Sequence, residues 1–163
     1  MRLTSHLGDR PLVIREWGEE EPRPDTSSEW DDWDDDWLPE ELTPVHHRAA
    51  IEVAGDVVGS MSWHAVQYGP TWGSCAWSMG IALVPSARGH GIGSVCQRLL
   101  SDHLLLSAFR VEASTDIDNV AEQRSLEKAG FAREGVLHGA QFRSDGVHHA
   151  LVMYARTRST LER

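Results

Sequence analysis

The stretch of sequence that decides the fold is Leu83-Val84-Pro85-Ser86-Ala87-Arg88-Gly89-His90-Gly91-Ile92-Gly93-Ser94. It joins an apolar run typical of a strand to an apolar pattern typical of a helix, with three alternate glycines at the junction. Glycines leave the backbone N–H groups of a turn uncovered, and the N-terminus of the following helix adds the positive end of its dipole. The stretch therefore predicts an anion site, with a diphosphate as the natural ligand.

Three other interpretations of this loop are weaker. A P-loop requires Lys and then Ser or Thr after its last glycine, but Ser94 and Val95 follow Gly93. A dinucleotide fingerprint requires G-x-G-x-x-G, whereas these glycines are spaced by two, and only about 70 residues follow them. A ligand-free turn leaves unexplained why three glycines, each costing up to ~1 kcal/mol within a helix, lie together.

The segment Arg88-Gly89-His90-Gly91-Ile92-Gly93 resembles the pyrophosphate loop of the GCN5-related N-acetyltransferase (GNAT) superfamily, whose pattern is Arg/Gln-x-x-Gly-x-Gly/Ala. Residues 119–131 resemble the N-x-x-S-x-x-x-x-E-K-x-G-F helix of the branch that contains the ribosomal-protein N-terminal acetyltransferases. The two motifs cover roughly the last half of the chain, and the first 45 residues match only weakly. The resemblance implies an α+β fold in one domain, residues 1–163, with helices flanking a mixed, mostly antiparallel sheet of about six or seven strands.

The resemblance also implies transfer of an acetyl group from acetyl-CoA to a primary amine. In the family the exposed backbone of the strand before the loop pairs with the pantetheine arm, which here means Leu83 and Val84. Asn119 and Arg124 would contact the cofactor from the next helix. The diphosphate of CoA would be held by Arg88, Gly89, His90, Gly91, Ile92, Gly93 and Ser94.

The general acid and base usual in the family are both missing. The chain has Glu122 where the branch often has a serine, Gln141 where it has a glutamate base, and Leu126 where other branches have a tyrosine acid. An amine of pKa near 10 is only ~0.1% neutral at pH 7, so a base or a water chain is required. Glu122 is the preferred base, and Asp116 and His64 are lesser candidates. For each of them a structural role stays open.

The negative charge is concentrated in one segment. Residues 16–41 contain thirteen Asp or Glu and one Arg, a local net charge of −12 out of a total of −10, so the rest of the chain sums to +2. Nucleic acid is therefore not expected as a partner, because phosphate binding needs clustered Lys and Arg.

Three tryptophans within this segment, Trp30, Trp33 and Trp37, are spaced as on one face of a helix. Ser28 before them and Pro39 after them are typical of helix ends. One interpretation is a docking helix with buried tryptophans and merely solvated aspartates. The other is an acidic wall of the acceptor cleft that attracts a cationic amine, with cation–π contacts from the tryptophans.

The remaining patterns predict a sheet with covering helices. Apolar alternation and turn residues such as Gly55, Gly130 and Gly146 mark the boundaries. The predicted strands are 12–16, 49–54, 57–67, 77–84, 110–115, 131–143 and 148–158, and the predicted helices are 92–104 and 119–129.

Length and composition suit one cytoplasmic domain. A chain of 163 residues with 40% hydrophobic content builds one core, and neither a membrane span nor a signal peptide is apparent. Cys75 and Cys96 are interpreted as buried reduced thiols, with a catalytic cysteine as the alternative, and no metal site is predicted. We expect an N-acetyltransferase for a cationic small-molecule or peptide amine. Protein N-terminal acetylation, a non-catalytic CoA-binding protein and a homodimer stay open.

Overall fold

Within residues 1–33 and 37–161, which the computed structural model describes, eight strands form one sheet in the order β1-β2-β3-β4-β5-β6-β8-β7. Neighbouring strands are antiparallel except for the parallel pair β5 and β6. The mixed, mostly antiparallel sheet is confirmed, with slightly more strands than predicted. The strands are β1 (Arg2–Leu7), β2 (Arg10–Arg15), β3 (His47–Val53), β4 (Asp56–Gln67), β5 (Cys75–Leu83), β6 (Arg110–Asp116), β7 (Ala132–Phe142) and β8 (His148–Thr157).

The strand that the prediction lacks is β1. It pairs with β2 at the edge of the sheet, and its residues alternate between exposed and half-buried. Leu3 and Leu7 pack against the core, whereas the residues between them are mostly polar. A polar edge strand without β-branched apolar residues has only a weak sequence pattern.

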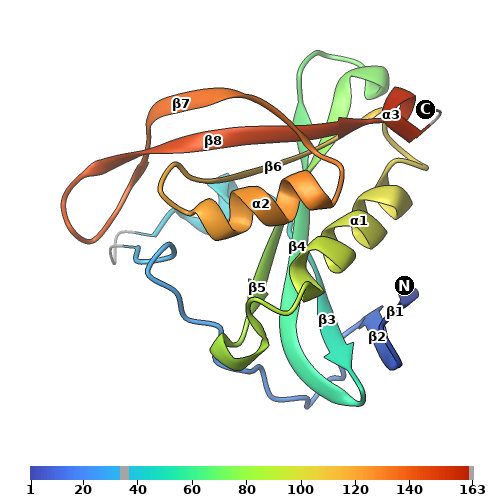
Figure 1. Ribbon diagram of the computed structural model, residues 1–163. Coiled ribbons are helices and arrows are strands. Elements are labelled where there is room, and N and C mark those ends of the chain that lie inside the picture. The colour runs from blue at the N-terminus through green and yellow to red at the C-terminus, as the bar shows by residue number, and fades with distance from the viewer. Residues whose placement is uncertain (34–36, 162–163) are drawn as a thin grey trace.

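Two long helices, α1 (Ile92–Leu104) and α2 (Val120–Lys128), confirm the predicted ones and lie on the same face of the sheet (Figure 1). Ile92, Cys96 and Leu100 follow one face of α1 and are buried against the sheet. No helix of the described part of the chain is long and apolar enough to span a membrane. The shorter elements are η1 (Glu40–Leu42), η2 (Trp72–Ser74), η3 (Pro85–Ala87) and α3 (Arg158–Leu161).

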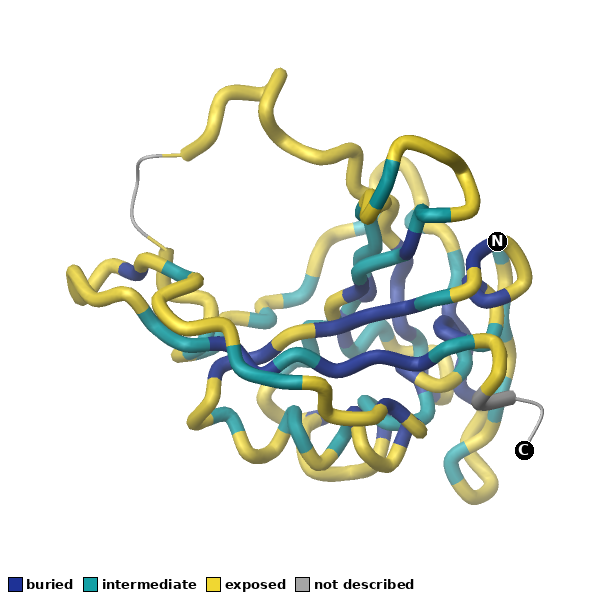
Figure 2. Tube along the Cα trace, turned by 90° about the horizontal axis from the view of Figure 1, so that it is seen from above, coloured by how far each residue is buried: buried dark blue, intermediate teal, exposed yellow. Residues whose placement is uncertain are grey.

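The core lies between these helices and the sheet. Figure 2 shows buried residues along the strands and exposed residues along the connection from β2 to β3. Cys96 is fully buried there, which raises the pKa of its thiol to about 12 and excludes a thiolate nucleophile at this position. Cys75 is half-buried rather than buried, and both cysteines are free thiols. Fully buried members of the core include Leu12, Ile14, Ile51, Met61, Leu100, Val111, Leu126, Val152 and Tyr154.

Two predicted turns are confirmed, although the first lies one residue earlier than the predicted pair Gly55-Asp56. Ala54 and Gly55 join β3 to β4 with φ of 54° and 95°, and this pair of positive φ values is what a two-residue hairpin of mirror-image type requires. Gly130 ends α2 with φ of 93°. The N–H of Phe131 then donates to the carbonyl of Leu126, which closes the helix.

The sheet opens between β5 and β6. These strands pair at Trp77–Val111 and Ser78–Glu112, and beyond these positions both continue in different directions (Figure 1). The separation leaves the inner edges of two strands facing each other without hydrogen bonds between them. This opening positions the candidate site.

In residues 30–33 and 37 of the acidic segment the predicted helix is absent. The described part of this segment makes a turn at Glu29 and Trp30, continues without regular structure and reaches η1. Trp33 and Trp37 are 38% and 72% exposed, so neither is buried as a docking helix would require. Asp and Trp are weak helix formers, and closely spaced carboxylates repel one another. Residues 34–36, which the prediction included, lie outside the described residues.

Candidate active site

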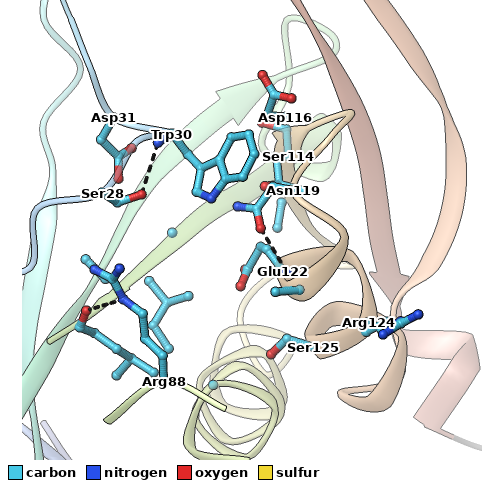
Figure 3. A pocket seen from close by; sticks show the side chains of 18 of the residues that line it. Ser28, Trp30, Asp31, Arg88, Ser114, Asp116, Asn119, Glu122, Arg124 and Ser125 are labelled. Atoms are coloured by element: carbon cyan, nitrogen blue, oxygen red, sulfur yellow. Dashed lines mark hydrogen bonds between the residues drawn. The ribbon is translucent and has the colours of Figure 1, made fainter. Parts of the chain in front are cut away.

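A pocket of about 490 Å³ lies in the opening between β5 and β6. Strand β5 contributes residues 79–83 to its lining, and β6 contributes residues 113–116. One side of α2 forms a wall (Figure 3). The glycine loop before α1, part of the acidic segment, and Gln141 and Arg143 complete the lining, so residues 26–31, 79–94, 113–128 and 141–143 all contribute to the pocket.

The glycine loop presents backbone donors to this pocket. Gly89 and Gly91 have φ of +76° and +78°, and nothing lies within 4 Å of where their Cβ atoms would be. Gly91 is the N-cap of α1, and no side chain caps that helix. The N–H groups of Ile92, Gly93 and Ser94 in its first turn therefore remain for a ligand. The loop has the free space, the donors and the dipole that suit a diphosphate.

The side chains of the loop contribute less than its backbone. His90 is exposed and does not line the pocket, and the side chain of Ile92 is buried in the core. Ser94 lines the pocket, but its hydroxyl donates to the carbonyl of Gly91 at 3.0 Å. Binding by His90 and Ile92 stays a prediction that concerns only their backbone groups.

The backbone of Val84 is not open as expected. Its N–H donates to the carbonyl of Val58 at 2.9 Å, and its own carbonyl accepts from Ala87 at 2.9 Å. Its pairing with a pantetheine arm stays a prediction, which concerns only the remaining lone pair of its carbonyl. Because successive residues of a strand direct their N–H and C=O groups to opposite edges, Leu83 directs its groups toward the opening. The residues of β5 that share this edge are Met79, Ile81 and Leu83.

The guanidinium of Arg88 is already bound to backbone carbonyls. Its Nε donates to Leu83 at 3.0 Å, and its Nη2 donates to Thr26 at 3.2 Å and to Ser27 at 2.7 Å. Arg88 therefore joins the end of β5 to the acidic segment at the pocket. Its contact with a cofactor stays a prediction.

Asn119 and Arg124 line the pocket from α2. The Oδ1 of Asn119 accepts the N–H of Glu122 at 3.2 Å and so caps the helix. The amide nitrogen of Asn119 is then the side-chain atom that can donate to a ligand. Arg124 is exposed, and its side chain extends away from Glu122 (Figure 3).

Glu122, the preferred base, lies inside the pocket within a hydrogen-bond network. The Nε2 of Gln97 on α1 donates to the Oε1 of Glu122, and the Oγ of Ser125 donates to the Oε1 of Gln97 at 2.7 Å. Burial raises the pKa of Glu122 to about 7, opposed by the hydrogen bond from Gln97 and assisted by the charge of Asp31. The carboxyl group is therefore about half ionised at neutral pH.

Asp116, the second candidate base, is paired with a cation. Its Oδ2 lies 2.8 Å from Nη2 of Arg143 and 3.4 Å from Nδ1 of His149. Its Oδ1 accepts the N–H of Asp118 at 2.7 Å. Gln141 joins this group through its Oε1, which accepts from Arg143 at 3.2 Å. Asp116 and Gln141 thus line the pocket as parts of a charged wall.

His64, the third candidate, lies outside the lining of this pocket. It faces His46 with ring centroids 4.6 Å apart. Burial and the neighbouring His46 lower the pKa of His64, so its ring is neutral at pH 7. The structure does not bring it together with the other two candidates.

The acidic segment reaches the pocket through Trp30 and Asp31. The indole of Trp30 lies over the pocket between Asp31 and Asn119 (Figure 3). The hydroxyl of Ser28 accepts the N–H of Trp30 at 3.1 Å, which holds the turn. Although Asp31 is exposed as a residue, its carboxyl group lies at the pocket, where partial removal from water raises its pKa against the opposing charge of Arg143. This segment is therefore part of the site without being a helix.

A known protein family matches most of this chain. Residues 3–132 match the family model described as the acetyltransferase (GNAT) domain. The chain belongs to the GNAT family. The search of curated proteins found no match.

Solved structures share the fold of this GNAT domain. Mycobacterium smegmatis RimJ, in complex with CoA-disulfide, has a TM-score of 0.63 and 24% identity, over 72% of this chain and 56% of its own. RimL, a ribosomal L7/L12 alpha-N-protein acetyltransferase in complex with CoA, has a TM-score of 0.60 and 25% identity, over 69% of this chain and 62% of its own. The aminoglycoside acetyltransferase AAC(6')-Ib with CoA has a TM-score of 0.57 and 22% identity, over 72% of this chain and 69% of its own. The chain thus spans less than two thirds of RimJ and of RimL.

Several residues of this GNAT site lack a sequence signal. Gln97 reads as one polar position in an amphipathic helix, and Arg143 as part of a strand end. Backbone groups alternate between the two edges of β5, so Met79 and Ile81 face the edge opposite to that of Val84. The sequence predicts this alternation, but one hydrogen bond must be known before each residue can be assigned to an edge. The spacing of Trp30 predicted a helix, which the described part of the acidic segment does not form.

Proposed function

We propose that the protein is an acetyl-CoA-dependent N-acetyltransferase that acts on a primary amine. The observation that carries this proposal is the opening between β5 and β6, where a free strand edge and a glycine loop with uncapped helix donors meet in one pocket. A diphosphate suits the loop, and an extended amide-containing arm suits the strand edge. Membership of the GNAT family supports the same reaction.

The residues present fit CoA. Gly89 and Gly91 leave open space at the N-terminus of α1 for its diphosphate. The edge of β5 at Met79, Ile81 and the N–H of Leu83, together with the amide of Asn119, would hold its pantetheine arm, since the carbonyl of Leu83 already accepts from Arg88. Acetyl-CoA, when bound, supplies an acyl group activated as a thioester.

Glu122 is proposed to accept the proton that the acceptor ammonium must lose before it reacts. At neutral pH a carboxyl group of pKa about 7 is ionised in part of the protein molecules and can accept a proton there. It then binds that proton more tightly than an ordinary glutamate does. Asp116 is less suited because Arg143 already neutralises it. Gln141 has no proton to exchange in this pH range.

The acceptor is inferred to be cationic. Asp31 and Glu122 both lie at the pocket, and each charge penalises the other, so an ammonium group between them would relieve the repulsion. The indole of Trp30 beside them offers a face for the same cation. A protein N-terminal amine is a second acceptor class, favoured by the 25% identity to RimL. Its pKa of about 8 demands less of the base.

A direct assay tests the proposed reaction. The protein would be incubated with acetyl-CoA and putrescine, kanamycin or a short unblocked peptide, and free CoA and acetylated amine would be measured by mass spectrometry. Acetylation of a polyamine or aminoglycoside supports the cationic small-molecule acceptor, and acetylation of the peptide alone supports the second class. Tight binding of CoA without turnover of any amine would favour the non-catalytic alternative.

Replacing Asp31 by asparagine should weaken acceptor binding more than turnover. We expect a KM for a cationic amine about tenfold higher, because one desolvated charge partner is lost. The acidic limb of kcat/KM should also move to lower pH, since removing the like charge lowers the pKa of Glu122. The measurement is a set of pH profiles for both proteins.

Glu29→Gln is the matched control for this substitution. Glu29 is exposed, lies two residues away and does not line the pocket, yet its replacement removes the same charge. Equal effects of the two variants, both abolished by salt, would mean that the segment acts only through its overall field.

A further inference from the structure

We propose that Gln97 is a positioning residue that holds the Glu122 carboxylate in the pocket in its proton-accepting form. The proposal rests on the proposed function, in which Glu122 takes a proton from the acceptor ammonium. Gln97 lies in the middle of α1 and is 1% exposed, so its amide cannot exchange its partners for water. Its Nε2 donates to the Oε1 of Glu122 on α2.

Ser125 fixes the direction of this contact. Its Oγ donates to the Oε1 of Gln97 at 2.7 Å, which places the amide NH₂ group against Glu122. An ionised carboxylate can only accept hydrogen bonds, so this orientation favours the ionised form. Both polar atoms of the buried amide are thereby satisfied, and the network gives the Glu122 side chain one defined position.

The network begins beside the glycine loop. A Cβ atom on Gly93 would lie 2.8 Å from the Oγ of Ser125, so the absence of a side chain at Gly93 makes room for the hydroxyl. Gly93, Ser125 and Glu122 line the pocket, and a hydrogen-bonded chain from Ser125 through the buried amide of Gln97 to Glu122 lies behind that wall. It links the predicted diphosphate site to the predicted base through groups that carry no charge.

No cation among the described residues forms an ion pair with Glu122. The charge of Asp31 in the acidic segment acts on it, and Asp116 on β6, which lines the same pocket, is paired with Arg143 at 2.8 Å. Four other cations lie near the pocket. Arg88 is bound to backbone carbonyls. Arg124 and Lys128 lie on α2 itself, and Arg98 on α1 donates to the carbonyl of Lys128. The hydrogen bond from Gln97 is thus the side-chain contact that counters burial.

Gln97→Met tests the proposal because methionine keeps the length and volume of the side chain and removes its donor. The Glu122 titration, followed by NMR of ¹³C-labelled glutamate side chains without acceptor, should have a midpoint about one pH unit higher. The acidic limb of kcat/KM, measured with the amine that the parent acetylates best, should move by the same amount. Turnover at pH 7 should fall roughly fivefold, while the Kd for CoA stays within about twofold. Ser125→Ala should move both midpoints in the same direction by less.

Ser101→Ala is the matched control on the same helix. Ser101 is fully buried and bonded to Arg156, so its loss lowers stability without touching Glu122, and both midpoints should stay in place. An unchanged NMR titration in Gln97→Met would overturn the positioning role. A shifted NMR titration with an unmoved kinetic limb would overturn the catalytic part of the proposal. A shifted titration in a protein that acetylates no amine would support the contact and count instead against the proposed function.

Discussion

Replacing Gly91 by aspartate is expected to abolish CoA binding, with the Kd rising by at least a hundredfold. The new side chain would enter the open space in front of the first turn of α1, and its negative charge would occupy the place of the diphosphate. Aspartate tolerates positive φ better than most residues and caps helices well, so the fold should persist. Isothermal titration with CoA measures the change.

Gly8→Asp is the control for this substitution. Gly8 also has positive φ, at +60°, and open space at its Cβ position, but it lies in the turn between β1 and β2. It therefore introduces the same strain and charge away from the loop. Gly91→Ala adds the strain and a Cβ atom without the charge, and should weaken binding less. Unaltered CoA affinity in Gly91→Asp would remove the glycine loop from the proposed site.

Glu122→Gln is expected to lower kcat/KM by ~10²-fold and to remove the acidic limb of its pH profile. Glutamine keeps the shape of the side chain but cannot take a proton in this range. In the parent, the limb should have its midpoint near the pKa of about 7 that burial gives Glu122. Steady-state rates between pH 5 and 9 for both proteins would show the difference.

A second readout of the same variant requires no acceptor. Because folding raises the pKa of Glu122 from the ordinary 4.5 to about 7, the folded state binds a proton that the unfolded state releases between these values. The parent should therefore lose up to about 3 kcal/mol of stability as pH rises through this window, and Glu122→Gln should not. Glu29→Gln, at an exposed position outside the pocket lining, is the control for both measurements. Retention of rate and limb in Glu122→Gln would leave the proton to water or to Asp116.

Most of the fold could be predicted because its signals are local. The apolar stripe of α1, the glycine after α2 and the hairpin turn at Gly55 each depend on residues close in sequence. The strand β1 could not, because its partner β2 rather than its own composition makes it a strand. The tryptophan spacing favoured a helix, but tertiary contacts hold that segment instead, at Arg88 and through the Ser144 N–H, which donates to the carbonyl of Asp32.

The part of the candidate site that the backbone forms could be predicted from the sequence. The part that depends on contacts between side chains was harder to predict. The glycine motif located the loop, since positive φ and missing Cβ atoms are properties of glycine itself. Glu122 and its partner Gln97 lie 25 residues apart on different helices, and no periodicity in the sequence links the two residues. The pairing of Asp116 with Arg143 likewise arises only when β7 and β8 bring the two residues together.

The separation of β5 from β6 has a consequence for solubility. An unpaired strand edge on the outside of a protein is a template on which other chains add strands and aggregate. Here the open edge from Met79 to Leu83 faces inward, into a space of about 490 Å³ bordered by α2 and the acidic segment. A strand of another chain would have to pass between these borders with its side chains, whereas a thin unbranched arm needs less room. The protein thus keeps backbone groups available for a ligand without offering them to a second polypeptide.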